Sequence, residues 1–231
     1  MSAFEGQIAL VTGASRGLGY AVAKSLAAEG AHVIALARTV GGLEELDDEI
    51  RASGGETTLV PLDITDDKGL EGLGAAIHQR WGKLDLLIHA AAEPAPLSPA
   101  GHAALKDIEK ALKTNALATQ RLIRVAEPLL RAAENAQAVT LADPDTAGAT
   151  FNAAYGASKA AQASIWATWA KELASTQITV WSAAPPPMPT ALRARFHPGE
   201  DQSKLSSLDD VARRLIKSMQ SPPAAGETAA L

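Results

Sequence analysis

The hydrophobic and polar positions of the 231-residue chain follow two alternating patterns. Short apolar runs rich in β-branched residues predict buried strands, and longer stretches with apolar residues three or four apart predict amphipathic helices. The predicted strands are Ile8–Val11, His32–Ala37, Thr57–Leu62, Leu84–His89, Ala138–Ala142, Ile178–Ala183 and a short Glu227–Leu231. The predicted helices are Leu18–Glu29, Gly42–Ser53, Lys68–Trp81, Ala103–Leu130 (interpreted as two helices), Ala153–Ala174 and Leu208–Met219.

Strands that alternate with helices predict an α/β fold, a Rossmann-like doubly wound parallel sheet of about seven strands with helices on both faces. No linker, repeat or charge block divides residues 1–231, so a single domain is expected. The composition changes most at Pro185-Pro186-Pro187-Met188-Pro189. We interpret this segment as the start of a substrate loop near residues 185–206.

Composition narrows the function classes. Apolar residues make up 47% of the chain and the mean hydropathy is +0.01, which favours neither disorder nor a membrane protein. The net charge of −5 argues against general nucleic-acid binding. The absence of cysteine excludes disulfides and thiol chemistry, and the five histidines lack ligand spacing, so no metal site is expected. The first residues do not resemble a signal peptide, so a cytoplasmic location is expected.

The first motif with a chemical meaning is Thr12-Gly13-Ala14-Ser15-Arg16-Gly17-Leu18-Gly19. It follows the first predicted strand and opens the first predicted helix. Glycines allow a sharp turn and close backbone approach, and a helix N-terminus presents N–H groups and the positive end of the helix dipole. The motif therefore predicts a site for a nucleotide phosphate.

The second motif is Tyr155-Gly156-Ala157-Ser158-Lys159, at the start of a predicted helix. A separation of four residues puts Tyr155 and Lys159 on one helix face. A nearby ammonium favours the phenolate, so the pKa of Tyr155 is expected to fall toward working pH. Tyr155 is then a candidate general acid for carbonyl reduction, or base for alcohol oxidation.

With these two motifs the chain resembles the short-chain dehydrogenase/reductase family, single-domain NAD(P)-dependent oxidoreductases, from about residue 6 onward. Weaker matches are Leu62-Asp63-Ile64, Lys113-Thr114-Asn115 and the loop with Pro185 and Thr190. The resemblance implies that Asp63 contacts adenine, that Asn115 kinks a helix and holds a water behind Lys159, and that the loop contacts the nicotinamide carboxamide.

The resemblance implies the catalytic residues Tyr155, Lys159 and Asn115. The implied coenzyme contacts are Gly13, Ser15, Arg16, Gly17, Leu18, Gly19, Arg38, Asp63, Ile64, Ala90, Ala91, Tyr155, Lys159, Pro185, Met188 and Thr190. The second predicted strand ends at Arg38 without the carboxylate that would bind the 2′-hydroxyl of NAD. Arg16 and Arg38 suit a 2′-phosphate, so NADP is expected in preference to NAD.

Three departures from the family pattern lie at the nicotinamide end. Ala142 occupies the position of the usual serine, which donates a hydrogen bond to the substrate oxygen, and an ionised Asp143 would repel a developing alkoxide. Loss of one such donor costs roughly 10²–10³ in rate. The family's Asn-Asn-Ala-Gly reads His89-Ala90-Ala91-Ala92 here, and Pro186 replaces a glycine. Replacement donors would be Thr140, Thr146 or Thr150.

Two functions stay open. One is an NADP-dependent carbonyl reductase or alcohol dehydrogenase acting on a small molecule. The other is a dinucleotide-binding protein with weak or no catalysis that acts as a sensor or binds a partner. The substrate loop contains Leu192, Arg193, Arg195, Phe196 and His197, and we expect Arg193 and Arg195 on its solvent side. A homodimer or homotetramer is expected because the family uses the helix with Trp166 and Trp169 as an interface, although core packing also explains these residues.

Overall fold

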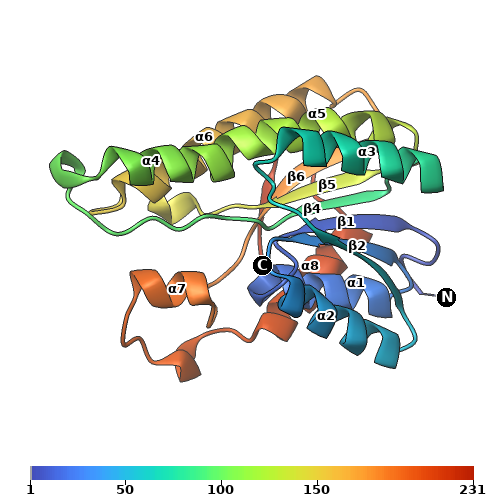
Figure 1. The fold of residues 1–231 in the computed structure, drawn as a ribbon, viewed down its shortest axis with the longest axis horizontal. Coiled ribbons are helices and arrows are strands. Elements are labelled where there is room, and N and C mark those ends of the chain that lie inside the picture. Colours follow the sequence, from blue (N-terminus) through green and yellow to red (C-terminus); the bar gives the residue numbers. More distant parts are fainter. Residues whose placement is uncertain (1) are drawn as a thin grey trace.

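The protein folds around one parallel sheet of seven strands, as the sequence predicts (Figure 1). The computed structural model describes residues 2–231. The strand order is β3-β2-β1-β4-β5-β6-β7, and every neighbouring pair is parallel. The strands are β1 Ile8–Thr12, β2 His32–Ala37, β3 Glu56–Pro61, β4 Leu86–His89, β5 Gln137–Leu141, β6 Thr179–Ala184 and β7 Thr228–Ala230.

The order of the strands reverses between β1 and β4, which lie side by side although they are far apart in sequence. The chain adds strands outward on one side through β2 and β3, then on the other from β4 to β7. In such sheets a crevice forms at the carboxyl ends of the strands where the direction of winding changes. The glycine turn after β1 and the small residues after β4 both lie at this point.

Helices cover both faces of the sheet (Figure 1). They are α1 Gly17–Ala28, α2 Val40–Ala52, α3 Asp67–Trp81, α4 Leu105–Ala111, α5 Ala118–Arg131, α6 Ala153–Glu172, α7 Ala191–Phe196 and α8 Leu208–Gln220. Side chains of β1 alternate between two apolar cores. Ala9 and Val11 pack with α1, α2 and α8, whereas Ile8 and Leu10 pack with α3, α5 and α6. Burial on both sides explains why the strands are apolar runs without polar alternation.

The segment interpreted as two helices contains α4 and α5 joined without a loop by a π-helix, Leu112–Leu117. Its side chains Asn115 and Ala116 are buried. A π-helical turn adds a residue to the helix and is frequent at functional sites. The structure also ends β5 at Leu141, so Ala142 lies just beyond the strand.

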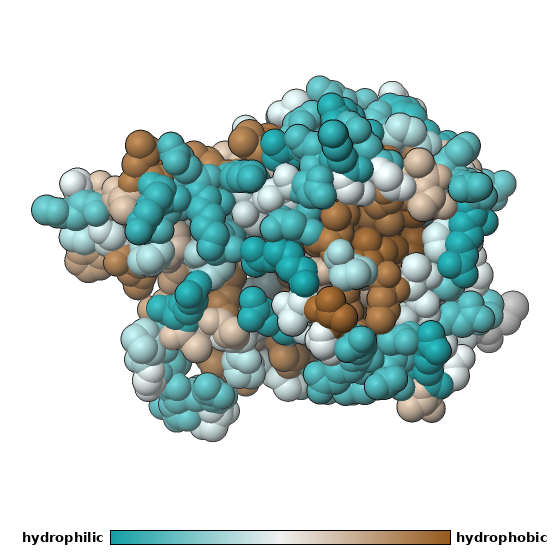
Figure 2. Space-filling model, viewed as in Figure 1, coloured by the Kyte–Doolittle hydropathy of each residue, from teal (hydrophilic) through white to brown (hydrophobic). Residues whose placement is uncertain are grey.

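Polar side chains cover most of the face in Figure 2, and an apolar area lies between α2 and α3. Within residues 2–231 no helix combines the length and hydropathy needed to span a membrane. The same residues contain no group of three or more His, Asp or Glu side chains arranged to hold a metal ion.

Candidate active site

At the glycine turn the surface is formed by backbone atoms, because side chains have no room there. Gly13 has a φ of +70°, and a Cβ added there would lie 2.8 Å from the backbone nitrogen of Ala91. A Cβ on Gly19 would lie 2.4 Å from the carbonyl oxygen of Gly13. Helix α1 follows directly, and its N-cap residue, Arg16, forms no side-chain cap. Its first-turn N–H groups therefore suit an anion.

All the residues implied as coenzyme contacts line one cleft of about 1230 Å³ at the carboxyl ends of the strands. The glycine turn and Arg38 come from β1 and β2, Asp63 and Ile64 follow β3, and Ala90 and Ala91 follow β4. Tyr155 and Lys159 lie on α6, and Pro185, Met188 and Thr190 follow β6. Asn115 is fully buried and is not part of the cleft wall. The sequence motifs therefore converge in one place.

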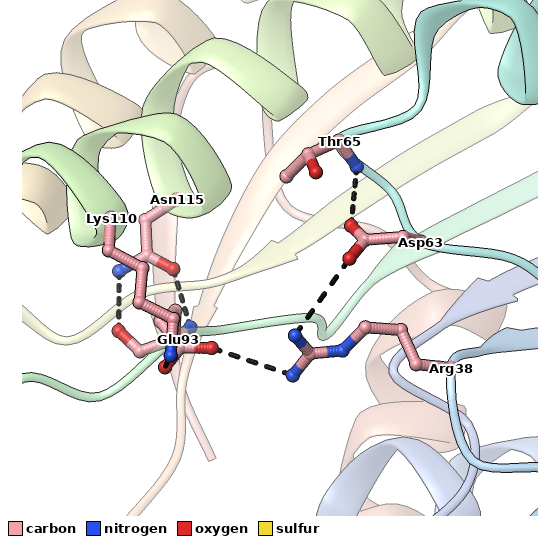
Figure 3. Close-up of polar contacts among 6 residues, drawn as sticks. All are labelled: Arg38, Asp63, Thr65, Glu93, Lys110 and Asn115. Carbon is pink, nitrogen blue, oxygen red and sulfur yellow. Dashed lines mark hydrogen bonds and ion pairs between the residues drawn. The ribbon is translucent and has the colours of Figure 1, made fainter.

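Asn115 ties three segments together from behind the cleft, and Figure 3 shows its bonds with Glu93. Its side-chain oxygen accepts a hydrogen bond from the Glu93 N–H at 2.7 Å, and its amide donates to the Glu93 carbonyl at 3.0 Å. The same amide donates to the Ser158 hydroxyl at 2.8 Å. Asn115 thus joins the π-helix to the loop after β4 and to the helix turn that carries Lys159.

Arg38 faces two carboxylates in the part of the cleft formed after β2, β3 and β4 (Figure 3). Its guanidinium lies 3.5 Å from the Glu93 carboxylate and 3.9 Å from that of Asp63. Lys110 also pairs with Glu93, at 2.6 Å. Glu93 and Lys110 line the cleft, and our sequence interpretation did not include them. The only feature of the sequence that could have indicated Glu93 is its position directly after the motif His89-Ala90-Ala91-Ala92.

The environment of Tyr155 contradicts the expected fall in its pKa. The Tyr155 hydroxyl donates to Asp143 Oδ2 at 3.2 Å, and the side chain is almost fully buried. Burial and the negative charge of Asp143 raise the pKa of Tyr155 above its usual value. The expectation from spacing was wrong because a carboxylate, and not the ammonium, is the polar group at this hydroxyl.

Lys159 lies on the same helix as Tyr155 but directs its ammonium elsewhere. It donates to the carbonyl of Leu141 at 2.8 Å and to the side-chain oxygen of Gln162. Burial lowers the pKa of Lys159 to about 8, while Asp143 acts in the opposite direction. Gln162 is itself buried, and its amide donates to Thr119 at 3.1 Å. The ammonium is therefore held between the end of β5 and a polar group inside the protein.

His89 takes part in the same buried network. Its Nδ1 lies 2.8 Å from the Thr12 hydroxyl and its Nε2 2.8 Å from the Thr119 hydroxyl. Complete burial, with a further contribution from the charge of Lys159, lowers the pKa of His89 to about 3. A neutral His89 can therefore join β1, β4 and α5 without introducing a buried charge.

Two of the three candidate replacement donors are already occupied. The Thr146 hydroxyl donates to the carbonyl of Asp143 at 2.8 Å, and the buried Thr140 hydroxyl donates to the carbonyl of His89 at 3.4 Å. Thr150 is exposed, lines the cleft and makes no side-chain hydrogen bond within residues 2–231. Of the three, Thr150 alone has a hydroxyl available to a ligand.

The loop after β6 carries α7, and residues of α7 line the cleft near Tyr155. The ring of Phe196 lies 5.0 Å from that of Tyr155, and Leu192 packs against the same cluster. Arg193 is not on the solvent side as expected, because it is half-buried and forms two hydrogen bonds with Glu200, at 2.8 and 2.7 Å. Arg195, in contrast, is exposed as expected.

Trp166 and Trp169 are core residues. Both are nearly inaccessible and their rings meet edge to face at 5.2 Å. The indole N–H of Trp166 donates to the carbonyl of Trp181, and that of Trp169 donates to Glu127. These side chains therefore provide no evidence for a subunit interface, and the homo-oligomer stays a prediction.

The protein has a Rossmann-like fold. This class is defined here by the doubly wound sheet, by the glycine turn where the strand order reverses, and by the pair of Tyr155 and Lys159 on α6. The chain belongs to the short-chain dehydrogenase family of oxidoreductases. The family model described as short chain dehydrogenase matches residues 7–201.

Curated relatives match parts of the chain. A fatty acyl-CoA reductase of Acinetobacter baylyi is 35% identical over 161 residues, which cover 68% of this chain and 54% of that protein. The 3-oxoacyl-[acyl-carrier-protein] reductase FabG of Escherichia coli K12 is 33% identical over 185 residues, covering 79% and 73%. The chain thus matches little more than half the length of the first of these relatives.

Solved structures share the whole fold. A short chain dehydrogenase from Shigella flexneri superposes with a TM-score of 0.93 at 26% identity, covering 99% of this chain and 92% of that one. A structure from Shigella flexneri 2a strain 301, complexed with NADP, gives a TM-score of 0.92 at 26% identity, covering 99% and 98%.

Proposed function

We propose that this protein is an NADP-dependent oxidoreductase that interconverts a carbonyl compound and an alcohol. The observation that carries the proposal is the single cleft that joins the glycine turn and Arg38 at one end to Tyr155 and Lys159 at the other. The backbone surface at Gly13 and the uncapped start of α1 fit a pyrophosphate.

The bound coenzyme would supply a hydride equivalent to the carbonyl carbon. Tyr155 would donate its hydroxyl proton to the carbonyl oxygen, and its raised pKa keeps that proton in place at neutral pH. Lys159, fixed by Leu141 and Gln162, would place a positive charge near the reacting groups. Asn115 would act through position, because it holds the β4 loop and the Ser158 turn and does not face the cleft.

The preference for NADP is supported by two arginines at the adenosine end. Arg16 is exposed on the glycine turn, and Arg38 is half-exposed beside it in the cleft. The contacts of Arg38 with Asp63 and Glu93 are long, at 3.9 and 3.5 Å, so a 2′-phosphate would compete for the guanidinium through shorter, bidentate, charge-assisted bonds. A structural relative holds NADP, which is consistent with this preference.

The proposal is tested by calorimetric titration of the protein with NADPH and NADH, followed by an NADPH-oxidation screen over diverse aldehydes and ketones. We expect tighter binding of NADPH and oxidation with at least one carbonyl substrate. Equal affinities, or tighter NADH binding, would contradict the coenzyme assignment.

A second function, dinucleotide binding with weak or no catalysis, is favoured by the hydrogen bond between Tyr155 and Asp143. In that bond the Tyr155 hydroxyl, which is the proposed proton donor, already donates its proton to Asp143. Ala142 provides no second hydroxyl for a substrate oxygen. NADPH binding without oxidation by any carbonyl compound in the screen would support this function.

A further inference from the structure

The carboxylate of Asp143 lies at the reacting end of the cleft without a cationic partner. Asp143 is half-buried, lines the cleft and forms no ion pair within residues 2–231. Its contact is the Tyr155 hydroxyl at 3.2 Å. A partly desolvated carboxylate is costly unless hydrogen-bond donors or a positive charge face it.

The nearby cations are engaged elsewhere. The Lys159 ammonium donates to the Leu141 carbonyl and to Gln162. The Arg193 guanidinium forms two bonds with Glu200. Both cations are near enough to Asp143 to feel its charge, yet neither forms an ion pair with it. The remaining acceptor capacity of Asp143 is therefore available to a ligand.

Apolar side chains lie around the ring of Tyr155, next to Asp143. The ring of Phe196 lies against Tyr155, and Leu192 packs beside it together with Ala154. A ligand with an apolar body and one hydrogen-bond donor would match these apolar side chains and the carboxylate together.

We propose that Asp143 selects substrates that carry an ammonium or hydroxyl group on the carbon next to the reacting carbonyl. This inference rests on the proposed reductase function and names its substrate class. A carbonyl oxygen that receives the Tyr155 proton must lie roughly 3 Å from that hydroxyl, and Asp143 Oδ2 lies 3.2 Å from the same hydroxyl. A donor group on the carbon next to the carbonyl can reach both the carbonyl oxygen and a carboxylate oxygen of Asp143.

The same substituent on the substrate supplies the hydrogen-bond donor that is missing at Ala142. An ammonium between the carbonyl oxygen and Asp143 offsets the negative charge that develops on that oxygen. Bound NADPH would supply the hydride to the carbonyl carbon. Tyr155 would transfer its one proton to the carbonyl oxygen, so its hydrogen bond to Asp143 would break and the substrate's ammonium would take its place at the carboxylate. The ketone is thereby reduced to an alcohol, and NADPH is oxidised to NADP⁺.

The test compares three matched ketones that share one aromatic body: acetophenone, α-hydroxyacetophenone and α-aminoacetophenone. Their binding is measured by calorimetry with the protein saturated with NADP⁺, which prevents reduction. We expect the amino ketone to bind about 10- to 100-fold more tightly than acetophenone, the effect of a hydrogen bond to a charged group. In the NADPH assay its kcat/KM should also be the highest of the three.

Asp143→Asn should remove this preference, and Asp143→Ser provides a second variant if the first does not fold. The matched control is Asp145→Asn, which neutralises an exposed carboxylate two residues away and should retain the preference. Equal binding of the three ketones, or a preference that survives in folded Asp143→Asn, would overturn the inference. Failure to bind NADPH in the titration described under Proposed function would instead contradict that function, and ketone binding to the protein alone would still test Asp143.

Discussion

His89 donates a hydrogen bond from Nε2 to the hydroxyl of Thr119, across 2.8 Å. The direction is fixed because the Thr119 hydroxyl already donates to the Asn115 carbonyl at 2.7 Å. The lowered pKa of this buried side chain keeps the imidazole neutral, so Nδ1 carries no proton and accepts from the Thr12 hydroxyl. Both ring nitrogens then have a hydrogen-bond partner.

This arrangement predicts an acid-sensitive stability. The pKa of His89 is about 3 in the folded protein, below the ordinary value of 6.5 that applies to the unfolded chain. Between these values the unfolded state binds the extra proton, so the stability contribution of neutral His89 is present above about pH 6.5 and is lost as the pH falls toward 3. From pH 7 to pH 5 the loss is about 2 kcal/mol.

Urea unfolding of the parent protein and His89→Asn at both pH values checks this prediction. The variant has no titrating group at this position, so its free energy of unfolding should fall by about 2 kcal/mol less over the same interval. His102→Asn, on an exposed short helix, serves as the control. An identical pH dependence of parent and His89→Asn would contradict the assignment.

Arg38→Asp tests the coenzyme preference. The change removes the guanidinium and adds a third carboxylate near Asp63 and Glu93, so NADPH affinity should fall by about 10- to 100-fold. NADH affinity should change less, because its ribose carries no 2′-phosphate. Calorimetric titrations with both coenzymes measure the ratio. Arg124→Asp, on the exposed side of α5, should leave it unaltered, and an unaltered ratio in Arg38→Asp would refute the role of Arg38.

Tyr155→Phe should reduce turnover by about 10²- to 10⁴-fold, the usual contribution of a positioned general acid. NADPH affinity should be nearly unchanged, because the ring still packs against Phe196. The other tyrosine of the chain provides a matched control, since Tyr20→Phe removes a hydroxyl on α1. Full activity of Tyr155→Phe in the NADPH-oxidation assay would show that another group transfers the proton.

Ala142→Ser should raise the rate of carbonyl reduction, by up to about 10²-fold if a missing oxyanion donor limits turnover. Ala142 follows β5, and its N–H donates to the Ala183 carbonyl at 2.8 Å, so the backbone there is anchored. A crystal structure of the variant must show the new hydroxyl directed toward the substrate position beside Tyr155. A correctly placed serine with unchanged turnover would contradict the missing-donor explanation and favour Thr150 or a non-catalytic role.

Sequence patterns predicted the sheet well because each buried parallel strand is an apolar run with its own local signal. The cleft residues were also predictable, since Gly13 to Gly19 and Tyr155 to Lys159 are contiguous motifs. The contacts between Arg38 and Glu93 join residues 55 positions apart, and no local pattern reports them. The environment of Tyr155 was missed for a similar reason. Helix spacing gives the face on which Lys159 lies, but its long side chain extends past the tyrosine to Leu141.

The close approach of Gly13 to Ala91 divides the cleft into parts with different tolerance to change. Its floor is backbone on both sides, and even one added methyl group would collide there. Side chains at the rim, such as Arg38 and Asp143, project from the ends of strands and have no such constraint. A change in the ligand that this cleft binds is therefore a matter of replacing rim residues one at a time, while the backbone around Gly13 stays as it is.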